Sequence, residues 1–420
     1  MATVTQKSVL DNGVRVVSES QPHAFSVTVG LWMEVGSRDE SPANNGVSHF
    51  IEHMAFKGTQ RRGTLDIARE IDRLGGMANA FTSREHTCFH CRALAKNLPQ
   101  MCDLLTDIFL HSSLEPEELE RERGVILQEI SGLEDTPDEL VHVLFGERFW
   151  PGHPLGRSIL GSQETIAALG RGDILTYLEG NYLPGRAVVS AVGNLEHQQV
   201  VDLVGPVLSA LAARPAGGRR QPPQPQAGLH VVESDLEQVH VALGLPAPRT
   251  IDPRRYQVAI LNLILGGNMS SRLFQEVRER RGLAYAVYSY LSSYRDAGLL
   301  GIYLGVAPER AVEALKVVRE EIQKLADSPV SPQELADSQE NLTGAILLAA
   351  ENPESRMSRL ARNEYNFGRD VPLAEALEQV QAVTQEDLSR LAGELLDQRH
   401  LAATVLGPVD EDALRRELNW

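Results

Sequence analysis

The stretch GVSHFIEHMAFKGT, residues 46–59, carries the most informative pattern in the chain. Its apolar spacing predicts a helix over 47–56. Within this helix, His49, Glu52 and His53 match the pattern His-x-x-Glu-His. Because side chains three and four positions apart share one face of a helix, both imidazoles can reach the same metal ion. Glu52 lies on that side and can hold a metal-bound water without binding the metal itself.

Neutral imidazoles suit Zn²⁺, which usually takes a third protein ligand from His, Asp or Glu. A second predicted helix, over residues 116–133, offers Glu122 and Glu129. These two are seven positions apart, so they lie two turns apart on one face. Glu129 stands in an apolar run, where a charged carboxylate needs a partner such as a metal. Spacing does not choose among the carboxylates of this helix, which also include Glu117, Glu118, Glu120 and Glu134.

A change of composition about halfway along the chain predicts two domains. Residues 214–228 contain four prolines and three glycines, which can continue neither a helix nor a central strand. We therefore expect a linker there, between an N-terminal metal-binding domain over 1–213 and a C-terminal domain over 229–420. The expected fold class is α+β.

The two halves resemble each other in the order of their predicted elements. Residues 94–129 run from a strand end through a helix and the sequence Ser-x-x-Pro-Glu-Glu-Leu into another helix. Residues 304–345 repeat this order, with Ser-Pro-Gln-Glu-Leu over 331–335 as the matching helix start. Aligning Leu119 with Leu335 gives an offset of 216 residues. The repetition predicts a duplicated domain, although any two α+β halves can share such an order.

The duplication also provides a control for the metal site. Under the same offset, Glu122 aligns with Ser338 and Glu129 aligns with Ala345. The second half also lacks the His-x-x-Glu-His pattern. The carboxylates are therefore lost together with the histidines, as expected if all belong to one site kept in only one half.

Three blocks, occurring in order, resemble the pitrilysin and mitochondrial processing peptidase family of zinc peptidases with the inverted motif. They are residues 46–59, ERERGVILQEI over 120–130, and HPLG over 153–156. The resemblance covers essentially the whole chain. It implies two duplicated domains, each a mainly antiparallel sheet with helices packed on one face, which together form one half of a clamshell.

The resemblance also implies a role for each motif residue. His49, His53 and Glu129 would bind one Zn²⁺ per chain, and Glu122 would support them from behind. Glu52 would be the general base that deprotonates the metal-activated water and returns the proton to the leaving amine. The implied activity is that of a zinc-dependent endopeptidase, which hydrolyses peptides or small unfolded proteins inside an enclosed chamber.

The second half carries a further block of the family, LGGNMSSRLF over 265–274, followed by Arg278 and Tyr285. The family uses an Arg and a Tyr at this spacing to hold substrate near the zinc, and both side chains can donate to a carbonyl or an oxyanion. From the residues alone, an Arg-rich helix end followed by a strand tyrosine is the better interpretation.

Residues 79–93 are predicted to be extended, and their first part resembles the active-site edge strand of the family. A bound peptide would join that strand through main-chain hydrogen bonds. A plain edge strand remains the alternative. The residues assigned to substrate binding are Asn79, Ala80 and Phe81.

Composition limits the classes of partner. The chain has 420 residues, with 40 Lys and Arg against 57 Asp and Glu, giving a net charge of −17. This charge disfavours nucleic acid and anionic lipid and favours basic peptides. Neither a signal peptide nor an apolar run of membrane-spanning length is evident, and three cysteines are too few for a disulfide scaffold. A cytoplasmic protein is expected, with Cys88, Cys91 and Cys102 as structural residues.

Enzymes of this family enclose substrate between two similar halves, each about the size of this chain. Since the chain carries both the zinc motif and the Arg/Tyr pair, a homodimer with two equivalent sites is the simplest expectation, and a heterodimer with a related subunit is the alternative. A non-catalytic subunit of a processing-peptidase-like or respiratory core-like assembly is a further alternative, which the intact metal set disfavours. An unrelated acidic binding protein with a chance motif is the remaining one.

Overall fold

The computed structural model describes residues 4–212 and 220–418. The chain forms two compact units, and each unit is assembled from three separate segments. The first unit comprises Met1–Gly132, Arg157–Arg220 and Leu348–Asp370, and the second comprises Leu133–Gly156, Gln221–Leu347 and Val371–Trp420.

The first unit is built on a six-stranded sheet with the order β1-β2-β6-β3-β5-β4. Only β2 and β6 run parallel, and all other neighbours are antiparallel. The strands are β1 (Val4–Val9), β2 (Arg15–Ser20), β3 (Ser26–Met33), β4 (Met77–Thr82), β5 (Thr87–Leu94) and β6 (Ala187–Gly193).

Helices of the first half cover one face of this sheet and enclose an apolar core with it. Alternate residues along β3, such as Val27, Val29 and Leu31, point into that core, as the two-residue period of a strand requires. The helices are α1 (Val47–Ala55), α2 (Thr64–Leu74), α3 (Leu98–Leu110), α4 (Pro116–Glu134), α6 (Gln163–Ala168), α7 (Arg171–Asn181) and α8 (His197–Leu208).

The second unit contains a five-stranded sheet with the order β7-β11-β8-β10-β9. Again a single pair, β7 with β11, is parallel, and the other pairs are antiparallel. The strands are β7 (Gly228–Glu233), β8 (Val239–Pro246), β9 (Ala284–Ser293), β10 (Gly298–Val306) and β11 (Ala402–Gly407).

Most helices of the second half pack on one face of the second sheet and form its larger core. Two short π-helical segments, Leu263–Gly267 and Phe274–Arg280, follow the first of these helices. The helices are α9 (Arg255–Asn262), α10 (Ala311–Asp327), α11 (Pro332–Glu351), α13 (Leu373–Gln381), α14 (Gln385–Leu395) and α15 (Glu411–Leu418).

The two sheets confirm the predicted α+β class and the mainly antiparallel sheets. Apart from the extra strand β1, the strand orders match one to one, including the position of the single parallel pair. The offset of 216 residues that aligns Leu119 with Leu335 also relates the starts of two helix pairs, Pro116 with Pro332 and Pro137 with Pro353. Proline is favoured at the first helical position because its missing N–H would be unpaired there in any case.

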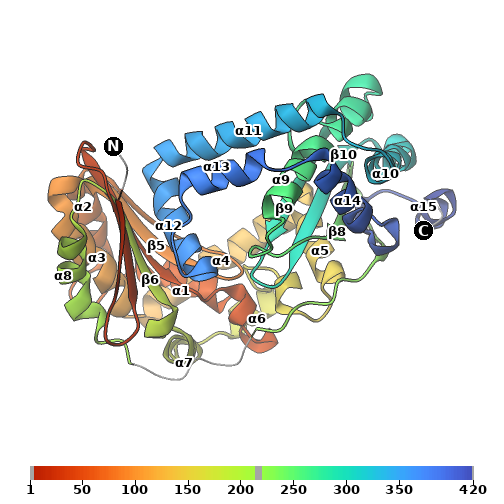
Figure 1. The fold of residues 1–420 in the computed structure, drawn as a ribbon. Helices are drawn as coiled ribbons and strands as arrows, with labels where there is room; N and C mark the ends of the chain where they lie inside the picture. The colour runs from red at the N-terminus through yellow and green to blue at the C-terminus, as the bar shows by residue number, and fades with distance from the viewer. Residues whose placement is uncertain (1–3, 213–219, 419–420) are drawn as a thin grey trace. The chain divides into compact units, whose positions relative to one another are not determined.

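Two helices are exchanged between the halves of the chain. Helix α12 (Pro353–Phe367), from the second half, packs on β2, β3 and β6 of the first sheet, whereas α5 (Pro137–Phe149), from the first half, packs on β8 and β11 of the second. Figure 1 shows α12 near β6 and α5 near β8. Each exchanged helix covers the sheet face opposite the main core of its unit. The expected contiguous domains, 1–213 and 229–420, therefore differ from the compact units by these two segments.

Glycines on the central strands make room for the exchanged helices. A Cβ on Gly30 of β3 would lie 2.3 Å from Sδ of Met357 on α12. A Cβ on Gly244 of β8 would lie 2.6 Å from Cζ of Phe145 on α5. Both distances are shorter than any normal contact. Each helix can therefore lie this close to its sheet only because the glycine has no side chain.

Two local predictions need correction at turns. Asn12-Gly13, flanked by the strand formers at 9–10 and 14–17, predicts a hairpin with a two-residue turn. The structure forms this hairpin as β1–β2, but its loop holds three residues, Asp11 to Gly13, and Gly13 has φ +98°. The extended segment 79–93 is a hairpin of β4 and β5, whose chain reverses after Thr82. Residues 214–219 of the expected linker lie outside the described residues.

Candidate metal centre

Helix α1 presents the His-x-x-Glu-His residues because its opposite side is anchored in the core. Phe50 and Met54 are fully buried among the apolar residues of the first unit. His49, Glu52 and His53 lie on the other side of the helix and are partly exposed. The prediction from the spacing is therefore confirmed: the three polar side chains share one face of the helix.

The start of α1 is held by a buried carboxylate that the sequence did not reveal. Glu40 accepts hydrogen bonds from the Asn45 side chain at 2.8 Å and from the backbone N–H groups of Gly46 and Ser48 at 2.8 and 2.9 Å. These are otherwise unpaired donors at a helix N-terminus, where a negative charge is also favourable. Burial raises the pKa of Glu40, although the hydrogen bonds oppose this shift.

The two carboxylates of α4 approach the histidines from different sides. Oε2 of Glu129 lies 3.5 Å from Nε2 of His49 and 3.6 Å from Nε2 of His53. Oε2 of Glu122 lies 3.0 Å from the other nitrogen of His53, Nδ1. Glu122 is buried, whereas the side chain of Glu129 is 41% exposed. The apolar neighbours of Glu129 in the sequence suggested that it would be enclosed by apolar residues. Instead, it faces the histidines from the surface.

The geometry fits a zinc ion held by His49, His53 and Glu129. One ligand atom from each residue lies within 4.8 Å of the other two. Nitrogen and oxygen ligands about 2.0–2.1 Å from a tetrahedral ion stand about 3.3–3.4 Å apart, close to both distances measured to Glu129. A hydrogen bond from Nδ1 of His53 to Glu122 would leave Nε2 free to bind a metal, an arrangement common behind metal-binding histidines.

Burial perturbs the pKa values of two residues of the candidate site, His49 and Glu52. Burial, together with the neighbouring His53, lowers the pKa of His49 to about 4. Burial raises the pKa of Glu52, while hydrogen bonds with Thr82 oppose the shift. Nδ1 of His49 and Oε2 of Glu52 are buried and have no hydrogen-bond partner among the described residues. Glu52 is therefore a carboxylate with an unused acceptor atom beside the metal ligands.

The predicted substrate strand is the edge strand β4, which stands at the end of the first sheet. It packs next to α1, and Thr82 at its end interacts with Glu52. Ala80 is buried toward the main core, whereas Asn79 is exposed and Phe81 points to the opposite face, where it contacts Trp32. The structure thus places the strand beside the candidate site, and its role in binding stays a prediction.

Arg278 and Tyr285 lie together in the second unit. Arg278 belongs to the second π-helical segment, and its guanidinium carbon lies 4.8 Å from the centre of the Tyr285 ring. Tyr285, near the start of β9, is 82% exposed. A stacked guanidinium and phenol can act together on one acceptor group, but the substrate role of this pair also stays a prediction.

The described part of the chain contains no helix that is long and apolar enough to cross a membrane. Its three cysteines are free thiols and all are buried, as the interpretation of structural cysteines requires.

Comparison with known families finds two adjacent matches. Residues 15–163 match the family model described as Insulinase (Peptidase family M16). Residues 168–342 match the model described as Peptidase M16 inactive domain. The candidate metal ligands all lie in the first match, and Arg278 and Tyr285 lie in the second.

Relatives over nearly the full length carry names of one kind. A protein of Streptomyces coelicolor named an uncharacterized zinc protease is 38% identical over 422 residues, which cover 98% of this chain and 91% of the relative. The uncharacterized zinc protease YmxG of Bacillus subtilis is 38% identical over 94% of this chain and 96% of its own length. A similarly named protein of Rickettsia felis is 34% identical over 96% and 97%.

Solved structures share the fold. A structure described as the peptidase M16 inactive domain from Pseudomonas fluorescens matches with a TM-score of 0.91 and 21% identity, over 96% of this chain and 98% of that one. A protease from Helicobacter pylori matches with a TM-score of 0.89 and 22% identity, over 97% and 100%. At these identities the comparison supports the architecture alone.

Proposed function

Because the chain belongs to peptidase family M16, we propose that it is a zinc-dependent endopeptidase whose site is formed by His49, Glu52, His53 and Glu129. The observation that carries this proposal is that the Nε2 atoms of His49 and His53 lie 3.5 and 3.6 Å from the same oxygen of Glu129. The names of the relatives, which describe zinc proteases, support the same metal and the same reaction class.

His49, His53 and Glu129 would hold the ion. When bound, zinc supplies Lewis-acid chemistry, which polarises a peptide carbonyl and makes water more acidic. His49 stays neutral down to about pH 4, so it keeps a lone pair available over the whole physiological range. Glu122 orients the His53 ring by accepting from Nδ1.

Glu52 acts as the general base. Its position one turn along from His49 brings it beside the ligands without making it one, and its buried Oε2 has no competing donor among the described residues. The raised pKa of its carboxyl makes it a better proton acceptor than an exposed glutamate. It takes a proton from water, holds it at the carboxylate, and delivers it to the leaving amine.

Peptide substrates bind as an added strand along β4 through Asn79, Ala80 and Phe81, because this edge offers main-chain donors and acceptors next to Glu52. Arg278 and Tyr285 contact the substrate carbonyl or the developing oxyanion. The net charge of −17 favours basic peptides through long-range attraction. The protein works as a homodimer that encloses its substrates, since one chain carries both the metal motif and the Arg/Tyr pair.

The decisive experiment measures zinc content and peptide products together. The wild-type protein should contain about one zinc per chain and should cleave members of a peptide library, as detected by mass spectrometry. A chelator should abolish cleavage, and added zinc should restore it. A protein that binds no zinc, or that cleaves equally well in Glu52→Gln, would contradict the proposal; zinc binding without any cleavage would favour a non-catalytic subunit.

A further inference from the structure

Lys57 forms an ion pair with Glu122, the carboxylate that lies behind the candidate metal ligand His53. Its Nζ lies 2.6 Å from Oε1 of Glu122. The other oxygen of the same carboxylate, Oε2, lies 3.0 Å from Nδ1 of His53. Both oxygens of Glu122 are therefore used, one by an ammonium group and one by an imidazole.

The Glu122 side chain is only 7% exposed, so it depends on protein partners instead of water. A buried carboxylate that loses one of two partners is costly, and it shifts position to find another. Such a shift would change what Nδ1 of His53 meets. The ammonium group of Lys57 is thus positioned to keep the Glu122 carboxylate fixed.

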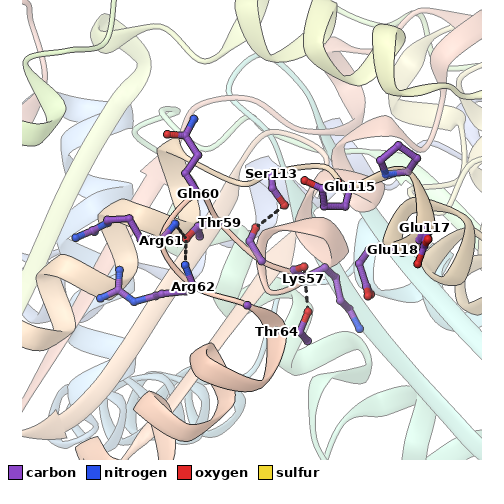
Figure 2. Close-up of a pocket in the computed structure, with 13 residues that line it drawn as sticks. Lys57, Thr59, Gln60, Arg61, Arg62, Thr64, Ser113, Glu115, Glu117 and Glu118 are labelled. Atoms are coloured by element: carbon purple, nitrogen blue, oxygen red, sulfur yellow. Dashed lines mark hydrogen bonds between the residues drawn. The ribbon is translucent and has the colours of Figure 1, made fainter.

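The backbone of Lys57 is held as firmly as its side chain. Its N–H donates to the Met54 carbonyl at 3.1 Å, where α1 ends. Its own carbonyl accepts from the Thr64 hydroxyl at 3.0 Å, a contact drawn as a dashed line in Figure 2. Figure 2 also shows Lys57 in the wall of a pocket, with Glu117 and Glu118 among the other lining residues.

The spacing along the chain adds to this picture. His49 and His53 lie about one turn apart on α1, and Lys57 follows His53 by four residues, just beyond the last residue of the helix, Ala55. The Lys57 ammonium reaches Glu122 from the end of the metal-binding helix, while His53 reaches it from within the same helix. One carboxylate on α4 therefore fastens α1 at two points.

We propose that Lys57 is a positioning residue of the metal centre, which acts through Glu122 to fix the His53 ring with Nε2 facing the metal. This inference rests on the proposed zinc site, and it goes beyond it by assigning a role to a residue outside the proposed ligands and general base. Residues that orient metal ligands from behind are commonly worth 10–100-fold in metal affinity or activity.

The chain offers a closely matched control. Lys7 on β1 and Glu364 on α12 form an ion pair of the same kind, with an Nζ–Oε1 distance of 2.7 Å and side-chain exposures of 38% and 4%, against 2.6 Å, 29% and 7% for Lys57 and Glu122. This pair also lies in the first unit. Lys7 is on β1, however, which is the edge strand at the opposite end of the sheet from β4.

The test compares Lys57→Met with Lys7→Met in the full-length protein. Zinc affinity is measured by competition with a chromophoric chelator, and thermal unfolding of the zinc-free proteins is followed in parallel. We expect the dissociation constant for zinc to rise about tenfold or more in Lys57→Met, to stay within about twofold of wild type in Lys7→Met, and to recover in Lys57→Arg.

A second measurement needs neither metal nor substrate. Histidine ¹⁵N spectra of the zinc-free protein should show His53 protonated at Nδ1 in wild type and in Lys7→Met, and a mixture of tautomers in Lys57→Met. Unchanged zinc affinity and an unchanged tautomer in Lys57→Met would overturn the inference while leaving the peptidase proposal standing. Equal losses of zinc affinity in both variants would overturn it too, since the effect would then follow stability. A wild-type protein without zinc affinity would overturn both.

Discussion

Helices α1 and α9 occupy corresponding places in the two halves but face different surroundings. Helix α1 packs Phe50 and Met54 into the first core and presents His49, Glu52 and His53, which are partly exposed, on its other side. Helix α9 packs Val258, Ile260 and Leu261 into the second core, and its remaining residues include neither a histidine nor a carboxylate. The second half thus keeps a core-facing helix at this place without the polar residues of the candidate metal site.

Helices α4 and α11 show the same difference. Glu122 and Glu129 correspond to Ser338 and Ala345, and Ser338 is buried. A serine and an alanine require neither a cation nor a metal, whereas the buried Glu122 requires both of its partners. The comparison teaches that the candidate metal site differs from the corresponding place in the second half by a few polar residues. The second half has the same fold without these residues.

The largest expected effect separates metal binding from catalysis within the first half. His49→Ala should remove zinc and activity together, because two ligands hold the ion poorly. Glu52→Gln should retain zinc and lose about 10²–10⁴-fold in kcat/KM, the range typical of general acid–base catalysis. Metal analysis and peptide cleavage check both. The control is Gln257→Ala, a change in α9 of the second half, which should leave zinc and activity unchanged.

The next effect tests whether the second unit of one chain serves the metal site of another. Glu52→Gln and Tyr285→Phe should each be nearly inactive alone. When the two are mixed and allowed to exchange subunits, a heterodimer regains one site with both residues intact, so about one quarter of wild-type activity per chain should return. Kinetics during exchange and light scattering measure this. A monomeric protein, or a mixture that stays inactive, would contradict a shared site.

A smaller effect concerns the exchanged helices. Met357→Ala on α12 should destabilise the first unit by about 2–5 kcal/mol, and Phe145→Ala on α5 should destabilise the second by about 3–5 kcal/mol, because both side chains fill apolar cores. Hydrogen exchange should therefore increase in β3 and β6 for Met357→Ala and in β8 and β11 for Phe145→Ala. If the amides lost their protection instead in the sheet of the half that contains the mutated residue, the packing of the exchanged helices described above would be contradicted.

The smallest effect is a pH dependence confined to the metal-bearing half. The pKa of His49 falls from 6.5 to about 4 on folding, so the unfolded chain binds more protons than the folded one between these values. The free energy of unfolding of the zinc-free protein should therefore fall by up to about 3 kcal/mol as the pH drops from 6.5 to 4. Urea titrations of wild type and His49→Gln measure it, and the variant should lack this part of the slope.

The sequence predicted the shared face of His49 and His53, since helical spacing alone determines it. The offset between Leu119 and Leu335 predicted the duplication, because proline marks equivalent helix starts. The exchange of α5 and α12 was not predictable in this way. The spacing of Val141, Phe145 and Phe149 gives an apolar stripe that must be buried, but a stripe does not say which of two similar sheets will bury it.

The candidate site, like the fold, was predictable only in part. The ligand residue types and their spacing were visible in the sequence, whereas the residues that hold them depend on contacts distant along the chain. Glu40 precedes α1 by several residues and gave no signal of capping it. Lys57 lay inside the quoted motif, but its contact with Glu122 appears only when α1 and α4 are placed together.

The late position of α12 in the chain has a consequence for biosynthesis. The last strand of the first sheet, β6, ends at Gly193, but the helix that covers its outer face ends only at Phe367. At about 5–20 residues per second, the ribosome needs on the order of ten seconds or more to make the intervening stretch. Until then Trp32 and Val188 face water or a chaperone, so the nascent N-terminal half completes its folding only after α12 has been made.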